Sequence, residues 1–217
     1  MLGQLRSKIA PLELALAKPF AMLGLSPNAI SLLGIPVALI AAYFIISEQF
    51  LLAAIFAAIA PFIDLVDGSV AKLTNKKTYF GNYLETMIDK YVEFILFAAC
   101  VFLYPIAAVL ALGFSLIESY AKPRVALVII ADNRDWPAIG EHADRLLILI
   151  AALLITAFYP IVYGYAVLEI ALYLIAAMTL LGGIQRILFA RGLIEEAKRK
   201  GNILPYLKKG LGHKAMK

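Results

Sequence analysis

Long apolar runs separated by short polar stretches dominate the sequence. Six runs are long enough to cross a bilayer as helices, because a hydrocarbon core about 30 Å thick needs roughly 20 helical residues. We place the six spans at residues 26–47, 50–74, 79–104, 106–131, 141–159 and 161–190. Charged residues and prolines interrupt the first 25 residues, which we interpret as an amphipathic helix on the membrane surface. The pattern predicts an all-α membrane protein with six transmembrane helices after an amphipathic juxtamembrane helix.

The composition agrees with this interpretation. Of the 217 residues, 63% are hydrophobic and 16% are charged, and the mean hydropathy is +0.86. A soluble domain is about half apolar and a quarter charged. We therefore divide the chain into the surface helix 1–25, a membrane domain at 26–190 and a basic tail at 191–217, and expect no separate soluble domain. The tail suits either anionic lipid or solvent, and no nucleic-acid motif is present.

The basic residues predict an orientation. The connections without lysine or arginine are 47–50, 104–106 and 159–161. Lys76 and Lys77 follow the second span, Arg134 follows the fourth, and the tail is rich in both residue types. By the positive-inside rule, both termini and the two basic loops face the cytoplasm. We expect a protein of the cytoplasmic membrane.

Four carboxylates occupy the second and third spans, at Asp64, Asp67, Glu85 and Asp89. Helical spacing places the first two on one face and the last two on another. At a rise of about 1.5 Å per residue, an antiparallel hairpin sets Asp64 level with Asp89, and Asp67 level with Glu85. Two divalent cations would neutralise these four charges, and oxygen ligands suit Mg²⁺ or Mn²⁺.

Two other interpretations of these acids remain open. They could form internal ion pairs with Lys72 and Lys90, although two lysines do not balance the four carboxylates and Glu93. A divalent-cation or proton-coupled transporter would also carry acids within its spans. The repeats and broken helices common in transporters are not evident in the sequence.

The acids belong to a longer motif. Its spacing is Asp64-x2-Asp67-Gly68-x2-Ala71-Lys72-x8-Gly81-x3-Glu85-x3-Asp89, which resembles the signature of the CDP-alcohol phosphotransferase family. The segment at 26–45 also resembles the first span of that family, with Asn28 followed by a hydroxyl residue at Ser31. Most members have arginine in place of Lys72 and aspartate in place of Glu85. Lysine keeps the positive charge without the bidentate guanidinium fork.

The resemblance implies an activity and roles for these residues. A hydroxyl of an acceptor would attack the phosphorus of a CDP-linked alcohol and release CMP at a site that faces the cytoplasm. The metal ligands would be Asp64, Asp67, Glu85 and Asp89, and Asp89 would also be the general base. The cytidine diphosphate would be bordered by Asn28, Gly68, Ala71, Lys72 and Gly81. A homodimer is the expected assembly.

A second polar cluster, near the predicted cytoplasmic ends of the last three spans, concerns the acceptor. It consists of Ser119, Lys122, Arg124, Arg145 and Arg186. Such cations equally suit a phosphate site or simple snorkelling anchors. The cluster resembles the branch of the family that uses inositol phosphate, which implies that it binds the acceptor phosphate. A CDP-linked lipid is the expected donor; soluble CDP-inositol as donor, and glycerol phosphate or serine as acceptor, are the alternatives.

Overall fold

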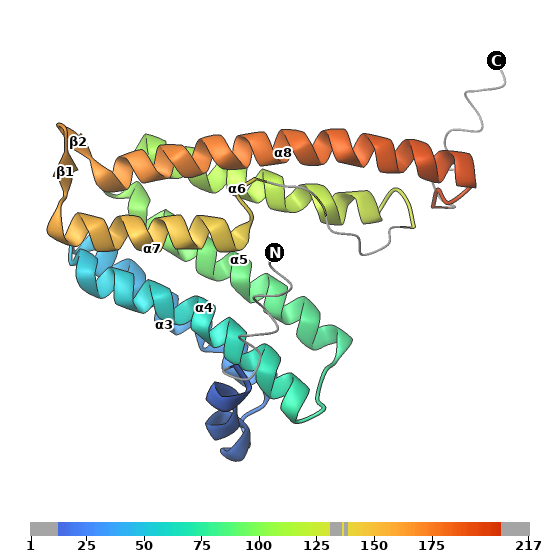
Figure 1. Cartoon of the computed structure of the whole chain (residues 1–217), viewed down its shortest axis with the longest axis horizontal. Helices are drawn as coiled ribbons and strands as arrows, with labels where there is room; N and C mark the ends of the chain where they lie inside the picture. The colour runs from blue at the N-terminus through green and yellow to red at the C-terminus, as the bar shows by residue number, and fades with distance from the viewer. Residues whose placement is uncertain (1–12, 131–135, 137–138, 205–217) are drawn as a thin grey trace. The chain divides into compact units, whose positions relative to one another are not determined.

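The structure, a computed structural model, describes residues 13–130, 136 and 139–204. Residues 13–22 of the predicted surface helix are helical, whereas residues 1–12, Arg134 and the end of the basic tail lie outside the described residues. The helices that follow are α2 (Pro27–Leu32), α3 (Gly34–Ile46), α4 (Phe50–Leu73), α5 (Tyr79–Val101), α6 (Pro105–Ala126), α7 (His142–Phe158) and α8 (Val167–Lys200) (Figure 1). The predicted all-α architecture is confirmed, with one short hairpin added.

Four described segments are long and apolar enough to cross a membrane: Pro27–Ile46, α4, α6 and α8. Helix α7 has 17 residues, and α5 carries four charged side chains within its 23 residues. These two helices therefore lack the length or the uniform apolar character of the other four. Large apolar side chains such as Leu39, Tyr43 and Ile55 are exposed on the first two segments, as expected of surfaces that meet lipid.

The first predicted span is interrupted at Leu33, between α2 and α3. Pro36 explains the break, because a proline has no N–H to donate and its ring clashes with the carbonyl four residues earlier. The start of α2 follows its predicted signals. Ser26 caps the helix by accepting a hydrogen bond from the Ala29 N–H, and Pro27 occupies the first position.

The last span also departs from its predicted bounds. A hairpin of β1 (Ile161–Val162) and β2 (Tyr165–Ala166) precedes α8, so the helix begins at Val167 instead of residue 161. Tyr163 and Gly164 form its turn at φ of 51° and 84°, the left-handed geometry that two-residue hairpin loops require. Helix α8 then continues to Lys200, beyond the predicted end at residue 190.

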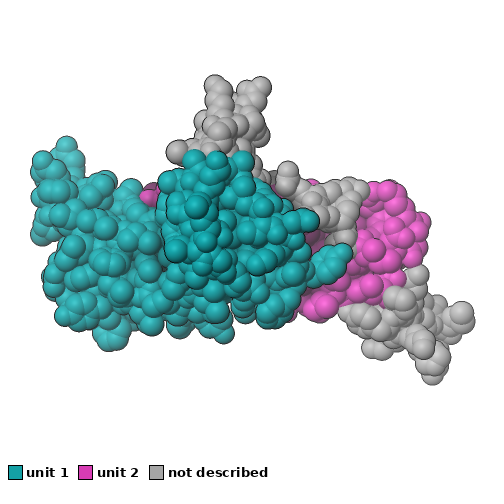
Figure 2. All heavy atoms as spheres, turned by 90° about the horizontal axis from the view of Figure 1, so that it is seen from below, with its two compact units in different colours: residues 1–105, 149–168 teal, residues 106–148, 169–217 magenta. Residues whose placement is uncertain are grey.

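The chain divides into two compact units (Figure 2). Unit 1 comprises residues 1–105 and 149–168, and unit 2 comprises residues 106–148 and 169–217. In unit 1, α2 and α3 each pack against both α4 and α5. Helices α4 and α5 make few contacts with each other. Buried alanines on α3 and α4 permit this close approach. The α4–α5 hairpin is therefore held open by the first span.

In unit 2, the segment before α7 lies directly on α8. The Ile139 N–H donates to the Gln185 side chain at 3.0 Å. A Cβ added at Gly182 would lie 2.2 Å from the Ile139 carbonyl oxygen, which is far inside contact distance. This packing therefore requires glycine at position 182.

This contact predicts that Gly182→Ala destabilises the protein by about 2 kcal/mol or more, as overpacking against rigid backbone does. Gly192→Ala on the same helix is the matched control, because nothing lies within 4 Å of its added Cβ. The control should gain up to about 1 kcal/mol from helix propensity. Thermal unfolding in detergent measures both, and equal melting temperatures would contradict the packing.

Candidate active site

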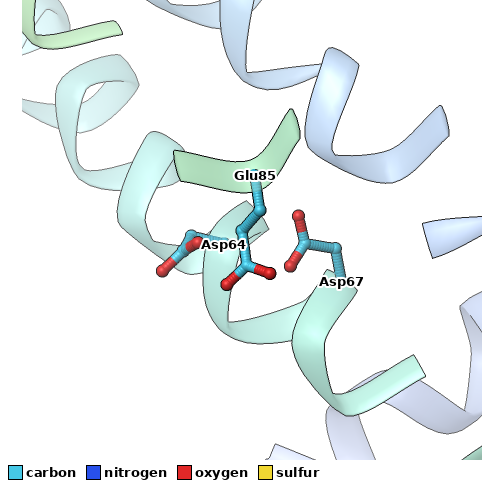
Figure 3. A group of neighbouring side chains, drawn as sticks. All are labelled: Asp64, Asp67 and Glu85. Carbon is cyan, nitrogen blue, oxygen red and sulfur yellow. The ribbon is translucent and has the colours of Figure 1, made fainter. Parts of the chain in front are cut away.

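Three carboxylates gather where α4 faces α5. Asp64 and Asp67 project from neighbouring turns of α4, and the Glu85 carboxylate from α5 lies between them (Figure 3). One ligand oxygen from each residue lies within 4.8 Å of the others. Oxygens that share one Mg²⁺ at about 2.1 Å lie at most about 4.2 Å apart, so small side-chain rotations complete such a site.

Asp67 is the most buried member of this carboxylate cluster. Its side chain is 3% exposed, and its Oδ2 accepts a hydrogen bond from the buried hydroxyl of Ser31 on α2. The other oxygen, Oδ1, is buried without a hydrogen-bond partner. A buried carboxylate oxygen that lacks a partner is costly, and a bound cation removes that cost. The donor set and this orphaned atom fit a divalent metal.

A cavity of about 390 Å³ opens beside the cluster. The three carboxylates line it together with the five residues predicted to border cytidine diphosphate: Asn28, Gly68, Ala71, Lys72 and Gly81. Nothing lies within 4 Å of a Cβ added at Gly68, so this wall is open to a flat ligand. Lys72 and Lys77 interact electrostatically with Glu85, so cations also lie near the acids.

Asp89 lies four residues after Glu85 on α5. Its carboxylate does not belong to the close group of three among the described residues, but it interacts electrostatically with Asp64, Asp67 and Glu85. Among these three acids, Asp64 has the largest effect on Asp89. The pairing of Asp64 with Asp89 and of Asp67 with Glu85 at equal depth stays a prediction.

The alternative of internal ion pairs holds elsewhere on α5. Lys90 Nζ lies 2.8 Å from Glu93 Oε2, and the Glu93 side chain is 1% exposed. Lys90 thus helps to neutralise Glu93, the fifth acid of the two helices.

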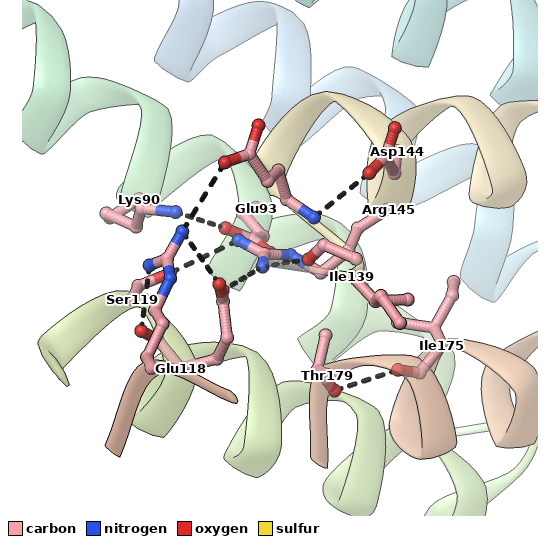
Figure 4. A network of polar contacts seen from close by, with 12 residues as sticks. Lys90, Glu93, Glu118, Ser119, Ile139, Asp144, Arg145, Ile175 and Thr179 are labelled. Carbon is pink, nitrogen blue, oxygen red and sulfur yellow. Dashed lines mark hydrogen bonds and ion pairs between the residues drawn. The ribbon is translucent and has the colours of Figure 1, made fainter. Parts of the chain in front are cut away.

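The predicted acceptor cluster is partly assembled in unit 2 around Glu118 (Figure 4). Arg145 Nη1 donates to Glu118 Oε2 at 2.6 Å, and Arg145 Nη2 donates to the Ser119 hydroxyl at 3.2 Å. Arg186 Nη2 lies 2.8 Å from Glu118 Oε1. Lys122 is half-buried and Arg124 is exposed, and neither takes part in these contacts.

Sequence reasoning gave no role to two residues that organise these clusters, Ser31 and Glu118. Each offered a signal: Ser31 is a hydroxyl in an apolar span, and Glu118 is a carboxylate within a predicted helix. Neither signal identifies a partner in another helix, which only the tertiary structure supplies.

Comparisons with known proteins identify similar sequences and structures. Residues 24–181 match the family model described as CDP-alcohol phosphatidyltransferase. An archaetidylinositol phosphate synthase of Pyrococcus horikoshii is 29% identical over 200 residues, which cover 90% of this chain and 99% of that protein.

Two crystal structures of the phosphatidylinositol phosphate synthase of Mycobacterium tuberculosis share the fold. The one with CDP-DAG bound has a TM-score of 0.72 and 19% identity, and covers 83% of this chain and 94% of that chain. The one with manganese and citrate has the same TM-score and identity, with coverage of 82% and 88%.

The Ser31 contact generates a prediction. Ser31→Ala removes the donor to a buried carboxylate, so we expect a loss of about 1–3 kcal/mol in the absence of metal. Thr74→Ala is the control, since its hydroxyl bonds only to the Val70 carbonyl within its own helix. Thermal unfolding in a chelating buffer checks this, and a melting temperature equal to that of the wild type would contradict it.

Proposed function

Because the chain belongs to the CDP-alcohol phosphatidyltransferase family, we propose that it transfers a phosphoalcohol group from a CDP-linked lipid to inositol phosphate and releases CMP. The observation that carries this proposal is the cluster of three carboxylates on the wall of a 390 Å³ cavity that also exposes Lys72 and an open Gly68. Anionic ligands, small residues and a cation around one cavity are what a nucleotide diphosphate and its metals require.

The proposed substrates have separate support. The structural neighbour from Mycobacterium tuberculosis was crystallised with CDP-DAG, which supports a CDP-linked lipid as donor. The Pyrococcus horikoshii relative is an archaetidylinositol phosphate synthase, and its alignment covers nearly all of both chains, which supports inositol phosphate as acceptor.

We assign two divalent cations, Mg²⁺ or Mn²⁺, to Asp64, Asp67, Glu85 and Asp89. When bound, the metals supply electrostatic stabilisation of the negative charge that develops on the diphosphate as CMP leaves. Asp67 enters this site already oriented, since Ser31 holds one of its oxygens. The Mycobacterium tuberculosis structure with manganese supports divalent metal use.

The remaining chemistry belongs to side chains of the chain itself. The acceptor oxygen forms a bond to the phosphorus as the phosphoanhydride bond to CMP breaks, and Asp89 accepts the hydroxyl proton. Lys72 places an ammonium near the phosphates, and Gly68 leaves room for the nucleotide, with Asn28, Ala71 and Gly81 beside it. Ser119, Lys122, Arg124, Arg145 and Arg186 bind the acceptor phosphate.

The proposed topology keeps six spans. Helix α5 is about 34 Å long and α7 about 25 Å at 1.5 Å per residue, so both reach or nearly reach across the hydrocarbon core. Of the charged side chains of α5, Glu85 lines the cavity and Glu93 pairs with Lys90. The basic loops then place both termini and the active site on the cytoplasmic side of the cytoplasmic membrane. A homodimer is the proposed assembly.

The role of Asp89 predicts that Asp89→Asn lowers acceptor-dependent CMP release by at least about 100-fold, because an amide cannot accept the proton. Purified protein with Mg²⁺, a CDP-lipid and inositol phosphate provides the assay, and a chelator should abolish the signal. Thr86→Ala, an exposed change on the same helix, should keep wild-type rates.

Near-normal turnover in a folded Asp89→Asn protein would show that Asp89 is not the general base. Cation flux into vesicles without any CMP release would instead favour the transporter alternative. A panel of glycerol phosphate, serine and free inositol, with CDP-inositol tested in parallel as donor, decides between the substrate alternatives.

The open wall at Gly68 predicts a second kinetic effect. Gly68→Ala should leave the melting temperature unchanged, because its Cβ meets nothing within 4 Å. It should raise the KM for the CDP-linked donor roughly 10-fold, because the methyl group occupies space assigned to the nucleotide. Gly113→Ala, also with open space around its Cβ, is the control. An unchanged donor KM would place the nucleotide elsewhere.

A further inference from the structure

A buried carboxylate without a part in the proposed reaction lies at the centre of unit 2. The Glu118 side chain is 1% exposed, and it lies on α6 between Arg145 of α7 and Arg186 of α8. One carboxylate oxygen pairs with each guanidinium, at 2.6 Å and 2.8 Å. Glu118 thereby links three helices through one carboxyl group.

The two arginines differ in how their hydrogen-bond donors are satisfied. Arg145 is 1% exposed, and its Nη1 also donates to the Gly140 carbonyl at 2.7 Å. Arg186 donates from Nη1 to the backbone carbonyl of Glu118 at 2.9 Å, while its Nε is buried without a hydrogen-bond partner. Arg186, which is 9% exposed, is thus the arginine with an unmet donor and some access to solvent.

Glu118 is shared by two guanidiniums. Arg186 also lies 3.7 Å from Glu141, whose side chain is 56% exposed. Solvent weakens that outer pair. The guanidinium that carries the unmet donor, that of Arg186, is therefore held mainly by Glu118, through its side chain and its backbone carbonyl.

From this we propose that Glu118 is a positioning residue, which orients Arg186, and Arg145 behind it, toward the phosphate of the acceptor. The inference rests on the proposed function, since it takes an anionic acceptor as the ligand. Close backbone approach supports the arrangement: a Cβ at Gly183, one turn before Arg186, would lie 3.9 Å from the Glu118 Cα. The two helices are thus near enough for Glu118 to bind the arginine through both side chain and backbone.

Positioning and simple electrostatics predict opposite results for Glu118→Gln. Removal of the negative charge raises the net positive charge of the cluster, so electrostatics alone would lower the KM for inositol phosphate. Loss of the ion pairs frees the guanidiniums from their orientation, so positioning predicts that this KM rises roughly 10-fold or more. The KM for the CDP-linked donor should stay within about twofold in either case.

The experiment measures both Michaelis constants for the full-length protein in detergent, with melting temperature as the folding check. Ser115→Ala is the matched control, because Ser115 is buried on the same helix and its hydroxyl has no hydrogen-bond partner. Glu118→Asp keeps the negative charge on a side chain that is shorter by one methylene group, so it should raise the acceptor KM less than Glu118→Gln does. If Glu118→Gln does not fold, Glu118→Asp carries the test.

An unchanged or lower acceptor KM in a folded Glu118 variant overturns the inference, as does an equal rise of both Michaelis constants. Calorimetric titration with inositol phosphate separates this failure from that of the proposed function. Weaker binding to the variant than to the wild type supports the positioning role even if the wild type shows no transfer. Equal binding, or no binding to either protein, contradicts it.

Discussion

A charge inside a membrane helix is stable only when a partner neutralises it, and this constraint governs the polar side chains of both units. Glu118 satisfies it with two arginines from other helices. The cluster of Asp64, Asp67 and Glu85 differs, because Asp67 accepts a hydrogen bond from the uncharged hydroxyl of Ser31 and the cations that act on Glu85 are lysines. Side chains of the protein pair within the Glu118 cluster, and we propose that divalent cations complete the other.

This difference gives the two clusters different tasks. A network of buried ion pairs fixes the geometry of its guanidiniums, which suits recognition of a substrate group. An acid-rich cluster beside a cavity suits metal-dependent phosphoryl chemistry, because converging carboxylates can hold metal ions next to the space for the substrate. The open α4–α5 hairpin serves this second task, since α2 and α3 pack against both helices and α2 supplies Ser31.

Local patterns in the sequence predicted the helices, whereas the composition of the cavity wall was predicted from the family resemblance. Helical spacing places Asp64 and Asp67 on one face of α4, and the structure brings both to the cavity with Gly68, Ala71 and Gly81. The break at Leu33 and the turn at Tyr163 were missed, although Pro36 and Gly164 were visible signals. The contacts made by Ser31 and Glu118 could not be predicted, because they join residues 36 or more positions apart or depend on three helices at once.

The central claim is that the carboxylates of α4 and α5 hold divalent metal, and Mn²⁺ binding tests it most directly. Electron paramagnetic resonance of the purified chain titrated with Mn²⁺ counts bound ions without reliance on turnover. The account predicts tight binding by the wild type, displacement by Mg²⁺, and at least about a 10-fold loss of affinity in Asp67→Asn. Wild-type Mn²⁺ affinity in a folded Asp67→Asn protein would contradict it.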